Sequence, residues 1–509
     1  MPGDDLFAER RRKVEELRLR GIPAYNVDYR VSHSLEKVRS LSPAVDPESA
    51  QPPEGERVSV AGRVMQLRLQ GKACFAHIED ESARMQVWFK SDRIGDDAYE
   101  VVRLLDLGDI IGVDGVVTRT RRGEPTVLAD ALTLLVKSLR PLPEKWHGLQ
   151  DQETRYRKRY LDLLSSDAQR RHFMARSAVV RALRSVLDSR GFLEVETPLL
   201  QPIAGGGSAV PFMTHWNSLD IDVFLRIAIE LHLKRLLVGG YERVYEIGRV
   251  FRNEGLSPRH NPEFTMLEAY QAYANLDDMR ELTETLVTTS AMALGPAHPE
   301  DGGSAPCDDP LLRRVGDTDL DLHPPFAVRR MVDLVRDATG IDAVAAWDEL
   351  HDAAHGLGVE VAAQLSPGAV LLEIYEQRVE HTIWAPTFVV EYPADVTPLA
   401  RRTPHDPRFV ERFELIAAGR ELANAFSELN DPVDQRQRFE EQARRRAAGD
   451  AEAPPIDEDF LEAIEVGMPP AGGLGVGVDR LLMLLTGASN IRDVLLFPTM
   501  RPQRQEPMQ

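Results

Sequence analysis

The stretch VYEIGRVFRNEGLSPRHNPEFTMLEAY, residues 244–270, decides the fold. It predicts two strands, 244–252 and 263–270, in which apolar and charged side chains alternate, joined by a loop of Gly, Pro, His and Arg. One face of such a pair packs on a core and the other lines a cleft. Because arginine grips phosphate at two points, the cleft face suits a nucleotide phosphate beside a small cationic substrate. The residues of that face are Arg252, Glu254, Arg259, His260 and Glu268. The alternative is a surface hairpin with solvated charges.

Composition sets broad limits on the class of protein. A chain of 509 residues predicts two or three domains, and 43% hydrophobic with 28% charged residues is typical of a soluble globular protein. Two cysteines, Cys74 and Cys307, exclude a disulfide framework and a cysteine-based zinc site. We find no membrane-length apolar run and no signal peptide, so we expect a cytoplasmic protein with no membrane partner. The net charge of −20 argues against a whole-surface nucleic-acid binder but allows a local basic groove.

The chain is predicted to have three parts, 1–55, 56–150 and 151–509. The first is a charged helix followed by a Pro- and Ser-containing connector. The second contains five short strands within residues 57–137, which suggest a small barrel, and then a Pro-broken linker. The third is one large unit of helices and strands. A helical, Ala- and Asp-rich inserted module is expected within it at about 285–370.

The small barrel carries a nucleic-acid hypothesis. Barrels of the OB type bind unpaired bases by stacking them on aromatic side chains of the strand face. Phe75 on the second strand, Gln86 on the third and Glu124 after a turn are placed to stack on and hydrogen-bond one base. The alternative places Phe75 in the barrel core and leaves Gln86 merely exposed.

Two apolar runs read as helices. Residues 181–201 predict a helix closed by Gly191 and a strand ending at Pro198; its apolar stripe fits a core helix or a self-complementary dimer interface. The run 224–240 contains a single acidic residue, Glu230, whose burial is costly unless it is paired. The partner is either a ligand ammonium or Lys234, four residues further along the helix.

A hairpin is predicted at residues 412–432, with its turn around Ala417–Ala418. That turn would place Glu414 opposite Glu421, and like charges directly opposite destabilise a sheet. A divalent cation between them removes the repulsion, and magnesium is usually held by carboxylates together with substrate phosphates. The alternative is a pair of solvated glutamates on a sheet edge.

Two further segments are predicted to wall a pocket. Residues i, i+2 and i+4 of a strand share one face, so the second hairpin strand contributes Asn424, Phe426 and Glu428. The segment GGLGVGVDRLLMLLTG, 472–487, predicts a glycine-alternating strand that runs into an apolar helix, with Arg480 in its first turn. Such glycines let a flat ligand approach the backbone. The segment is neither a P-loop nor a complete dinucleotide fingerprint.

These segments resemble the signature motifs of class II aminoacyl-tRNA synthetases. GFLEVETPLL resembles motif 1, FRNEG with RHNPEFTMLEAY resembles motif 2, and GLGVGVDRLLMLLTGASNIRDVLLFPTMRP resembles motif 3. The details, including GRELANAFSELNDP, RYRKRYLDLL and SLRPLPEKWHGL, are similar to the bacterial lysyl-tRNA synthetases of subclass IIb. The resemblance implies an α+β fold: an N-terminal OB-fold barrel that binds the anticodon, and an antiparallel β-sheet catalytic domain with helices.

The resemblance also implies an activity. A lysine–tRNA ligase uses ATP to convert L-lysine to lysyl-adenylate and pyrophosphate, then moves the lysyl group to the 3′ end of tRNA(Lys). Mg²⁺ is the implied cofactor and a homodimer the implied assembly. Two other functions compete with this one. A paralogue would activate lysine or an analogue for another acceptor, or regulate by binding tRNA; a synthetase for aspartate or asparagine would need cationic or amide groups in its pocket.

The roles implied by the resemblance fall on particular residues of this chain. Catalytic roles fall on Arg252 and Arg480. The residues implied to bind ATP are Arg252, Glu254, Arg259, His260, Phe264 and Arg480. Those implied to bind lysine are Glu230, Glu268, Tyr270, Asn424, Phe426 and Glu428, with Glu428 pairing with the ε-ammonium. Glu414 and Glu421 match the magnesium ligands, and Phe75, Gln86 and Glu124 match the residues that read the central U of the anticodon.

Several positions near the implied pocket depart from the family pattern. Ile229 stands where proline is usual, and His232 stands where an aromatic residue is usual. Val210 stands where arginine is usual, and Val466 stands where tyrosine is usual. The departures spare the pocket carboxylates.

Overall fold

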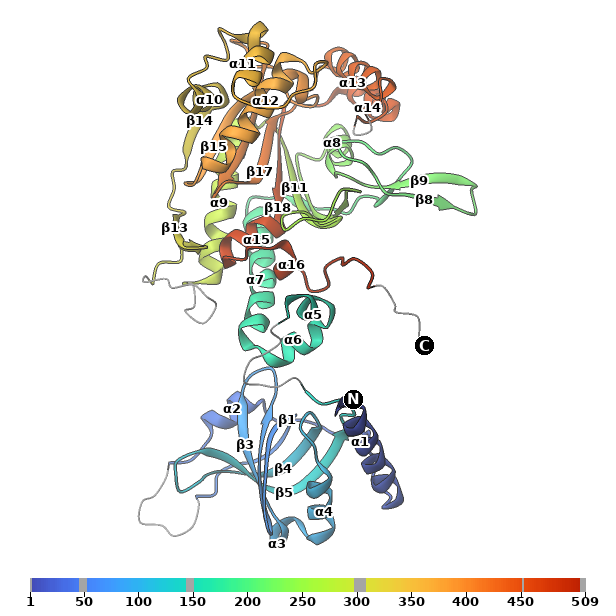
Figure 1. The fold of residues 1–509 in the computed structure, drawn as a ribbon, viewed down its shortest axis with the longest axis vertical. Helices are drawn as coiled ribbons and strands as arrows, with labels where there is room; N and C mark the ends of the chain where they lie inside the picture. Colours follow the sequence, from blue (N-terminus) through green and yellow to red (C-terminus); the bar gives the residue numbers. More distant parts are fainter. Residues whose placement is uncertain (1, 45–52, 143–150, 297–307, 451–452, 504–509) are drawn as a thin grey trace. The chain divides into compact units, whose positions relative to one another are not determined.

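The computed structural model describes residues 2–44, 53–142, 151–296, 308–450 and 453–503. The chain divides into two compact units, Met1–Leu149 and Gln150–Gln509, which are described separately (Figure 1). Cys307 and parts of the predicted connector and linker lie outside the described residues. Within the described ranges, no helix has both the length and the apolar character needed to cross a membrane.

The N-terminal unit is a closed five-stranded barrel, as the sequence predicted. Its strands follow the order β1-β2-β3-β5-β4 around the barrel, antiparallel except for the parallel pair β3–β5. In the first half of β1, Val58, Val60 and Val64 point into an apolar core, which explains the alternating pattern there. The elements are α1 Pro2–Leu19, α2 Leu35–Ser40, β1 Arg57–Gln70, β2 Ala73–Glu79, β3 Arg84–Lys90, α3 Ser91–Ile94, α4 Asp96–Leu104, β4 Ile110–Arg119 and β5 Pro125–Val136.

The C-terminal unit begins with helices and builds its sheet from segments far apart in the sequence. Its first half contains α5 Gln152–Arg157, α6 Arg159–Ser165, α7 Asp167–Ser189, β6 Leu193–Glu194, β7 Leu200–Gln201, β8 Met213–Trp216, β9 Ile221–Leu225, α8 Glu230–Val238, β10 Arg243–Phe251, β11 Glu263–Ala272 and α9 Leu276–Leu294. The predicted strand pair 244–252 and 263–270 is therefore confirmed as β10 and β11. The apolar stripe of α7 lies in the core, as expected of a core helix.

The second half completes the unit. Its elements are β12 Leu312–Val315, β13 Thr318–Asp321, β14 Ala327–Arg330, α10 Met331–Thr339, η2 Trp347–Glu349, α11 Leu350–Gly356, α12 Pro367–Arg378, η3 Glu380–Thr382, β15 Thr387–Pro393, η4 Ala394–Val396, β16 Phe409–Ala417, β17 Arg420–Ser427, α13 Pro432–Ala447, α14 Glu458–Gly467, β18 Ala471–Gly477, α15 Val478–Thr486 and α16 Ile491–Val494. The stretch expected as an inserted module holds strands as well as helices, and β14 joins the main sheet as its edge strand.

The main sheet has eight strands in the order β14-β15-β16-β17-β18-β11-β10-β6. Neighbours are antiparallel except for the pairs β14–β15 and β10–β6. Helices α7, α9 and α15 pack with the central strands in one large core, whereas α10, α11 and α12 pack with β15 and β16 (Figure 1). Helices α8 and α14 pack against β10 and β11 in a further cluster. The fold is thus the predicted α+β combination of an OB-fold barrel and an antiparallel sheet with helices.

The predicted register of the 412–432 hairpin is wrong. Its turn residues are Ala418 and Gly419, both with positive φ (+49° and +65°), and Glu414 pairs with Asn424 rather than with Glu421. A register shift follows, because Leu415 pairs with Ala423 but Ile416 pairs with Glu421, which leaves Leu422 as an extra residue. Such a β-bulge reverses the alternation of faces, so Glu421 lies on the same face as Asn424.

The predicted helix at 224–240 is only partly correct. Residues 221–225 form β9, which pairs with β8 in a hairpin that projects from the rest of the unit (Figure 1). The helix α8 begins at Glu230 and ends at Val238. The pairing with β8 satisfies the backbone of 221–225, so local apolar character did not decide its conformation.

A buried ion cluster fastens α1 to the barrel. The Lys137 ammonium donates to Asp106 and Asp109 at 2.6 Å each and to the Leu104 carbonyl at 2.7 Å, and its side chain is fully buried. Lys13 of α1 donates to the other oxygen of Asp106 at 2.7 Å. Burial raises the pKa of Asp109, while the two lysines outweigh burial and lower the pKa of Asp106. The cluster holds its charges because each one has a partner.

We expect Lys137→Met to destabilise the barrel by about 3 kcal/mol, because it leaves two carboxylates without their shared buried cation. Native-state hydrogen exchange of strands β4 and β5 in the full chain measures this loss locally. Lys13→Met removes a partly exposed partner of the same cluster and should cost less than about 1 kcal/mol. Equal protection in both variants would contradict the central role of Lys137.

Candidate functional site

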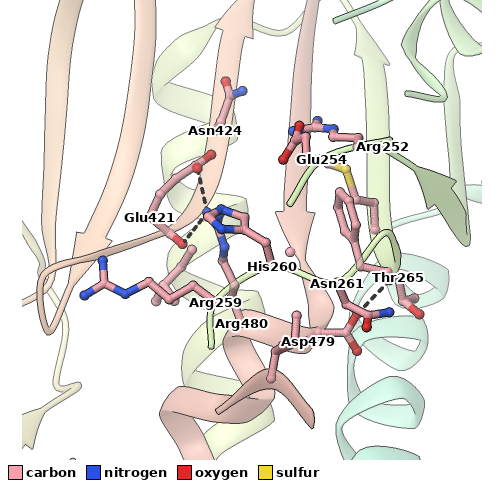
Figure 2. Close-up of a pocket in the computed structure, with 16 residues that line it drawn as sticks. Arg252, Glu254, Arg259, His260, Asn261, Thr265, Glu421, Asn424, Asp479 and Arg480 are labelled. Carbon is pink, nitrogen blue, oxygen red and sulfur yellow. Dashed lines mark hydrogen bonds and ion pairs between the residues drawn. The ribbon is translucent and has the colours of Figure 1, made fainter. Parts of the chain in front are cut away.

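Two adjoining cavities lie on one face of the main sheet. The first, here called the arginine cavity, has a volume of about 140 Å³, and its lining includes Arg252, Glu254, Arg259, His260, Phe264 and Arg480 (Figure 2). The second, here called the acidic cavity, has a volume of about 420 Å³, and its lining includes Glu230, Glu268, Tyr270, Glu376, Glu414 and Phe426. They share lining residues, namely Arg252, Met266, Glu421, Asn424 and Gly475, so together they form one continuous site.

The arginine cavity is built from the β10–β11 loop and the start of α15. The guanidinium of Arg252, which follows β10, lies 5.3 Å from the centre of the Phe264 ring on β11. Arg480 in the first turn of α15 points toward Glu421 and pairs with its carboxylate at 2.7 Å (Figure 2). The other end of the same guanidinium approaches Nε2 of His260 at 3.4 Å. Basic and aromatic side chains therefore face the same space.

The electrostatics of this cavity favour an anion. Burial first, and the neighbouring Arg480 second, lower the pKa of His260, so its imidazole is neutral at pH 7. Burial together with Arg259 and Arg480 also lowers the pKa of Arg420 beside the cavity. Because these basic groups lower one another's pKa, an added anion relieves their mutual repulsion, and arginine guanidinium groups are suited to bind phosphate at two points.

Asp479 fixes the strand and helix that carry these groups. Its Oδ2 accepts a hydrogen bond from the Thr265 backbone N–H at 2.7 Å (Figure 2). Its Oδ1 pairs with Arg176 of α7. Arg176 also donates to the Thr265 hydroxyl at 2.7 Å. The network ties α7, β11 and α15 together at the floor of the arginine cavity.

Glu414 and Glu421 both line the acidic cavity, although they are not opposite each other in the hairpin. Glu414 pairs with Arg412, whose guanidinium lies between the rings of Tyr392 and Phe426 at 4.3 and 5.6 Å. Burial raises the pKa of Glu414, whereas Arg480 and Arg412 outweigh burial and lower the pKa of Glu421. The bulge at Leu422 therefore brings Glu414 and Glu421 to the same cavity, as predicted, although the predicted pairing of the two residues is wrong.

Two further carboxyl groups, Glu376 of α12 and Glu380 of η3, lie near this pair. Burial and the charge of Glu414 raise the pKa of each to about 7. Across the described ranges, no group of three or more His, Cys, Asp or Glu side chains is arranged to hold a metal by itself. Two carboxylates at a cavity wall suit a magnesium ion only when a bound phosphate supplies further oxygens.

A buried ion triad, Glu230–Lys234–Glu428, lies at the far end of the acidic cavity, and of its members only Glu230 lines the cavity. The Lys234 ammonium donates to Oε1 of Glu230 at 2.7 Å and pairs with Oε2 of Glu428. The side chains of Lys234 and Glu428 are 0% exposed, and that of Glu230 is 9% exposed. Oε1 of Glu428 has no hydrogen-bond partner among the described residues. The predicted pairing of Glu230 with Lys234 is present, and Glu428 joins it.

Glu268 is the third carboxyl group at this end. Its two oxygens accept hydrogen bonds from the Ile229 N–H at 3.0 Å and the Tyr270 hydroxyl at 3.1 Å. Burial, followed by the charge of Glu230, raises its pKa to about 7. Ile229 matters here because proline, which is usual at this position in the family resembled, has no N–H to donate.

The predicted wall of Asn424, Phe426 and Glu428 is only partly exposed to the cavity. Asn424 and Phe426 line it, whereas Glu428 lies behind Gly473 of β18. A Cβ atom on Gly473 would overlap Oε1 of Glu428 and would lie 2.5 Å from Cε1 of Tyr270. Gly473 of the glycine run therefore makes room for the Glu428 carboxylate, a role that the alternation of glycines in the sequence did not indicate. Sequence reasoning also missed Arg412, which stands two residues before Glu414 and shares its strand face.

The remaining departures from the family pattern lie around the site. Val210 accepts a backbone hydrogen bond from Asn253 at 2.7 Å. His232 lines a small cavity beside the acidic cavity, and burial together with Arg235 lowers its pKa. Val466 is 81% exposed. None of these three touches the carboxyl groups of the site.

On the barrel, the structure brings together the three residues predicted to bind a base. Phe75 stacks on Trp88, with ring centres 5.2 Å apart and an interplanar angle of 19°. Gln86 donates to Glu124 at 2.9 Å and accepts from the Thr126 hydroxyl at 2.9 Å. Lys90 lies 3.9 Å from the Trp88 ring, and His77 hydrogen-bonds Glu124 at 2.9 Å. Trp88 and His77 were missed, although each pairs across the strands with a predicted residue.

Comparison with known proteins identifies the family. Residues 151–501 match the family of tRNA synthetases class II (D, K and N), and residues 58–135 match the OB-fold nucleic acid binding domain. The chain therefore belongs to the class II tRNA synthetases (D, K and N).

Several proteins similar to this chain over nearly its full length are lysine–tRNA ligases. A lysine–tRNA ligase of Moorella thermoacetica is 50% identical over 505 residues, covering 99% of each chain. One from Oceanobacillus iheyensis is 51% identical over 501 residues, covering 97% of each chain. One from Bacillus subtilis is 48% identical over 504 residues, covering 98% of this chain and 97% of that one.

Gly473→Ala should lower the free energy of unfolding by about 1–3 kcal/mol, because the new methyl group must push Glu428 and Tyr270 aside. Gly356→Ala is the matched control: a Cβ there meets nothing within 4 Å, and helix propensity makes the change neutral or stabilising by up to about 1 kcal/mol. Urea unfolding of both variants measures the difference. An equally mild effect at both positions would contradict the crowding at Gly473.

Proposed function

We propose that this protein is a lysine–tRNA ligase that activates L-lysine with ATP and transfers it to the 3′ end of tRNA(Lys). The observation that carries the proposal is the position of the acidic cavity. A carboxylate-rich pocket, with the buried carboxylate of Glu428 directly behind Gly473 of its wall, adjoins a cavity lined by arginines. A diamino acid fits the first and a nucleotide phosphate fits the second. The 48–51% identity to lysine–tRNA ligases supports the same assignment.

Phosphate binding falls to the residues of the arginine cavity. Arg252 reaches both cavities, so it can contact the α-phosphate and the lysine carboxylate at once. Arg480, Arg259 and His260 line the same cavity and are assigned to the outer phosphates. Phe264 offers its ring to the adenine, and Glu254 is available to its amino group. Aromatic stacking and bidentate guanidinium contacts are suited to such a ligand.

Lysine binding falls to the acidic cavity. Glu428 is assigned to the ε-ammonium, and Glu230 and Glu268 are assigned to the α-ammonium. Tyr270 donates its hydroxyl to Glu268 and so orients that carboxylate. Asn424 and Phe426 form the wall beside it. A synthetase for aspartate or asparagine would bring a carboxylate or an amide into this pocket, where three buried glutamates would repel or leave unpaired the incoming group.

Magnesium fits the cavity wall between the two ligand subsites. Glu414 and Glu421 would hold it, because both carboxylates face the cavity and the sharing of Glu421 between cavities places it beside the expected phosphates. When bound, the ion supplies charge neutralisation for the phosphate oxygens. Arg412 orients Glu414 and opposes the effect of burial on its pKa, whereas Arg480 orients Glu421 and helps to lower its pKa.

The reaction requires no protein nucleophile. The carboxylate oxygen of lysine attacks the α-phosphorus of ATP, the bond from that phosphorus to the pyrophosphate oxygen breaks, and lysyl-adenylate forms. A tRNA 3′-terminal hydroxyl then attacks the lysyl carbonyl and AMP leaves. The arginines act by holding the reactants in line and stabilising charge that develops on the phosphate oxygens.

The barrel is proposed to read the anticodon. Phe75, with Trp88 behind it, offers a stacking surface, while Gln86 and Glu124 offer hydrogen-bonding groups beside it. An aromatic surface of this kind stacks on any unpaired base, and the two polar side chains then select among the bases by hydrogen bonding. The presence of the barrel also favours a synthetase that charges tRNA over a paralogue that transfers lysine to another acceptor. We place the protein in the cytoplasm, where its substrates meet.

A homodimer completes the proposal. The strands β7, β8 and β9 and the turn between β8 and β9 carry a group of large exposed apolar side chains, among them Met213, Trp216, Leu219, Ile221 and Leu200. Exposed apolar patches of this kind mark protein contacts. A second copy of this chain is the partner implied by the family resembled.

Glu428→Gln tests the lysine pocket. The amide cannot replace a carboxylate as partner of a buried ammonium, so kcat/KM for lysine in ATP–pyrophosphate exchange should fall by about 100-fold or more. The KM for ATP should stay within about threefold, because Glu428 does not line the arginine cavity. Near-intact lysine-dependent exchange in this variant would show that Glu428 has another role.

Phe75→Ala tests the barrel separately. Loss of one stacking ring should lower kcat/KM for charging of tRNA(Lys) by about 10- to 100-fold. ATP–pyrophosphate exchange with lysine, which needs no tRNA, should be unchanged and is the internal control. Equal charging by the variant and the unaltered protein would exclude Phe75 from tRNA recognition.

A further inference from the structure

We infer that Lys234 is a specificity-determining positioning residue, which sets the charge of the amino-acid subsite to match a diamino acid. This inference rests on the proposed function and deepens it. Lys234 lies on α8, does not line the acidic cavity, and bridges two carboxylates assigned to opposite ends of the substrate, Glu230 and Glu428. It acts through these two groups rather than by touching lysine itself.

The bridge formed by Lys234 occupies one oxygen of each of two carboxylates. Lys234 uses Oε1 of Glu230 and Oε2 of Glu428, which leaves Oε1 of Glu428 without a hydrogen-bond partner in the described part of the chain. A fully buried carboxylate with one oxygen held and the other unpaired is costly unless a ligand donates to it. The held oxygen fixes the direction of the free one. Lys234 thereby aims the carboxylate while a neighbouring substrate ammonium completes its pairing.

The charges of this subsite match those of a diamino acid. When all three carboxyl groups are ionised, Glu230, Glu268 and Glu428 bring three negative charges to this end of the site, and Lys234 brings one positive charge. The subsite therefore offers two negative charges, which equal the two ammonium groups of lysine. Without Lys234, three carboxylates would face two ammoniums, and desolvation would force one carboxyl group to keep its proton. Lys234 is the element that lets all three act as acceptors.

The pH dependence of lysine binding follows from the groups around Glu428. The titratable groups that face it are Lys234 and Glu230 from α8, and Glu268 and Tyr270 from β11. Burial and the two glutamates raise the pKa of Glu428, and Lys234 opposes them. Lysine binds the ionised form, so binding weakens as pH falls through that pKa. Removal of Lys234 raises the pKa further and moves the loss to higher pH.

The test is lysine-dependent ATP–pyrophosphate exchange by full-length Lys234→Met between pH 6 and pH 9. The KM for lysine should rise by about tenfold or more at neutral pH, with the KM for ATP nearly unchanged. The difference in KM for lysine between the variant and the unaltered protein should shrink toward pH 9. The acid limb of log kcat/KM should therefore move to higher pH by about half a pH unit or more. Lys137→Met is the matched control, since it removes another fully buried lysine with two carboxylate partners, in the barrel.

The outcomes are distinct. A loss that is the same at every pH would show that Lys234 acts only through packing, and an unchanged KM for lysine would show no role; either result overturns the inference. Should Lys234→Met fail to fold, Lys234→Gln, which keeps a hydrogen-bond donor but not the charge, must give the same shift of the acid limb. If the unaltered protein itself shows no lysine-dependent exchange, the proposed function fails rather than the role of Lys234.

Discussion

The structure of the site depends on one constraint: a carboxylate taken out of water must meet a cation. The C-terminal unit buries Glu230, Glu268, Glu414 and Glu428 along one face of its sheet, and these carboxyl groups meet that constraint in different ways. Arg412 pairs with Glu414, and Lys234 pairs with both Glu230 and Glu428. Glu268 is held by neutral donors, which leaves its pKa raised to about 7. The carboxylate charge that no protein cation neutralises is what makes a cationic substrate necessary.

The sheet separates opposite charges so that one ligand must join them. Arginines from the β10–β11 loop and α15 meet at one end, and glutamates from α8, β11 and the end of β17 meet at the other. Arg252, Glu421 and Asn424 belong to both cavities and mark the boundary. A molecule with an ammonium group at each end and a carboxylate beside one of them, bound next to a polyphosphate, satisfies both groups of charges. The attacking oxygen and the phosphorus then lie at that boundary, where positioning contributes most to rate.

Sequence patterns predicted the elements well and their exact pairing poorly. The β10–β11 pair, the five barrel strands and the strand–helix unit at 472–487 follow from alternation, glycine and turn chemistry, which are local. The bulge at Leu422 and the positive φ of Ala418 are set by partners across the sheet, so the predicted opposition of Glu414 and Glu421 was wrong. The link between Lys234 and Glu428 spans 194 positions and leaves no periodic signal. The pairing of Lys234 with Glu230 was visible because it is local to one helix.

The most direct measurement of the central claim is ATP–pyrophosphate exchange by the purified full-length protein with lysine, ornithine, arginine, aspartate and asparagine in parallel. The same preparation is then assayed for charging of tRNA(Lys). The acidic subsite predicts exchange that depends on lysine, with little or none for aspartate and asparagine, followed by charging. Preferred exchange with another amino acid, or exchange with lysine but no charging, would contradict the account and indicate a synthetase-like protein with a different acceptor.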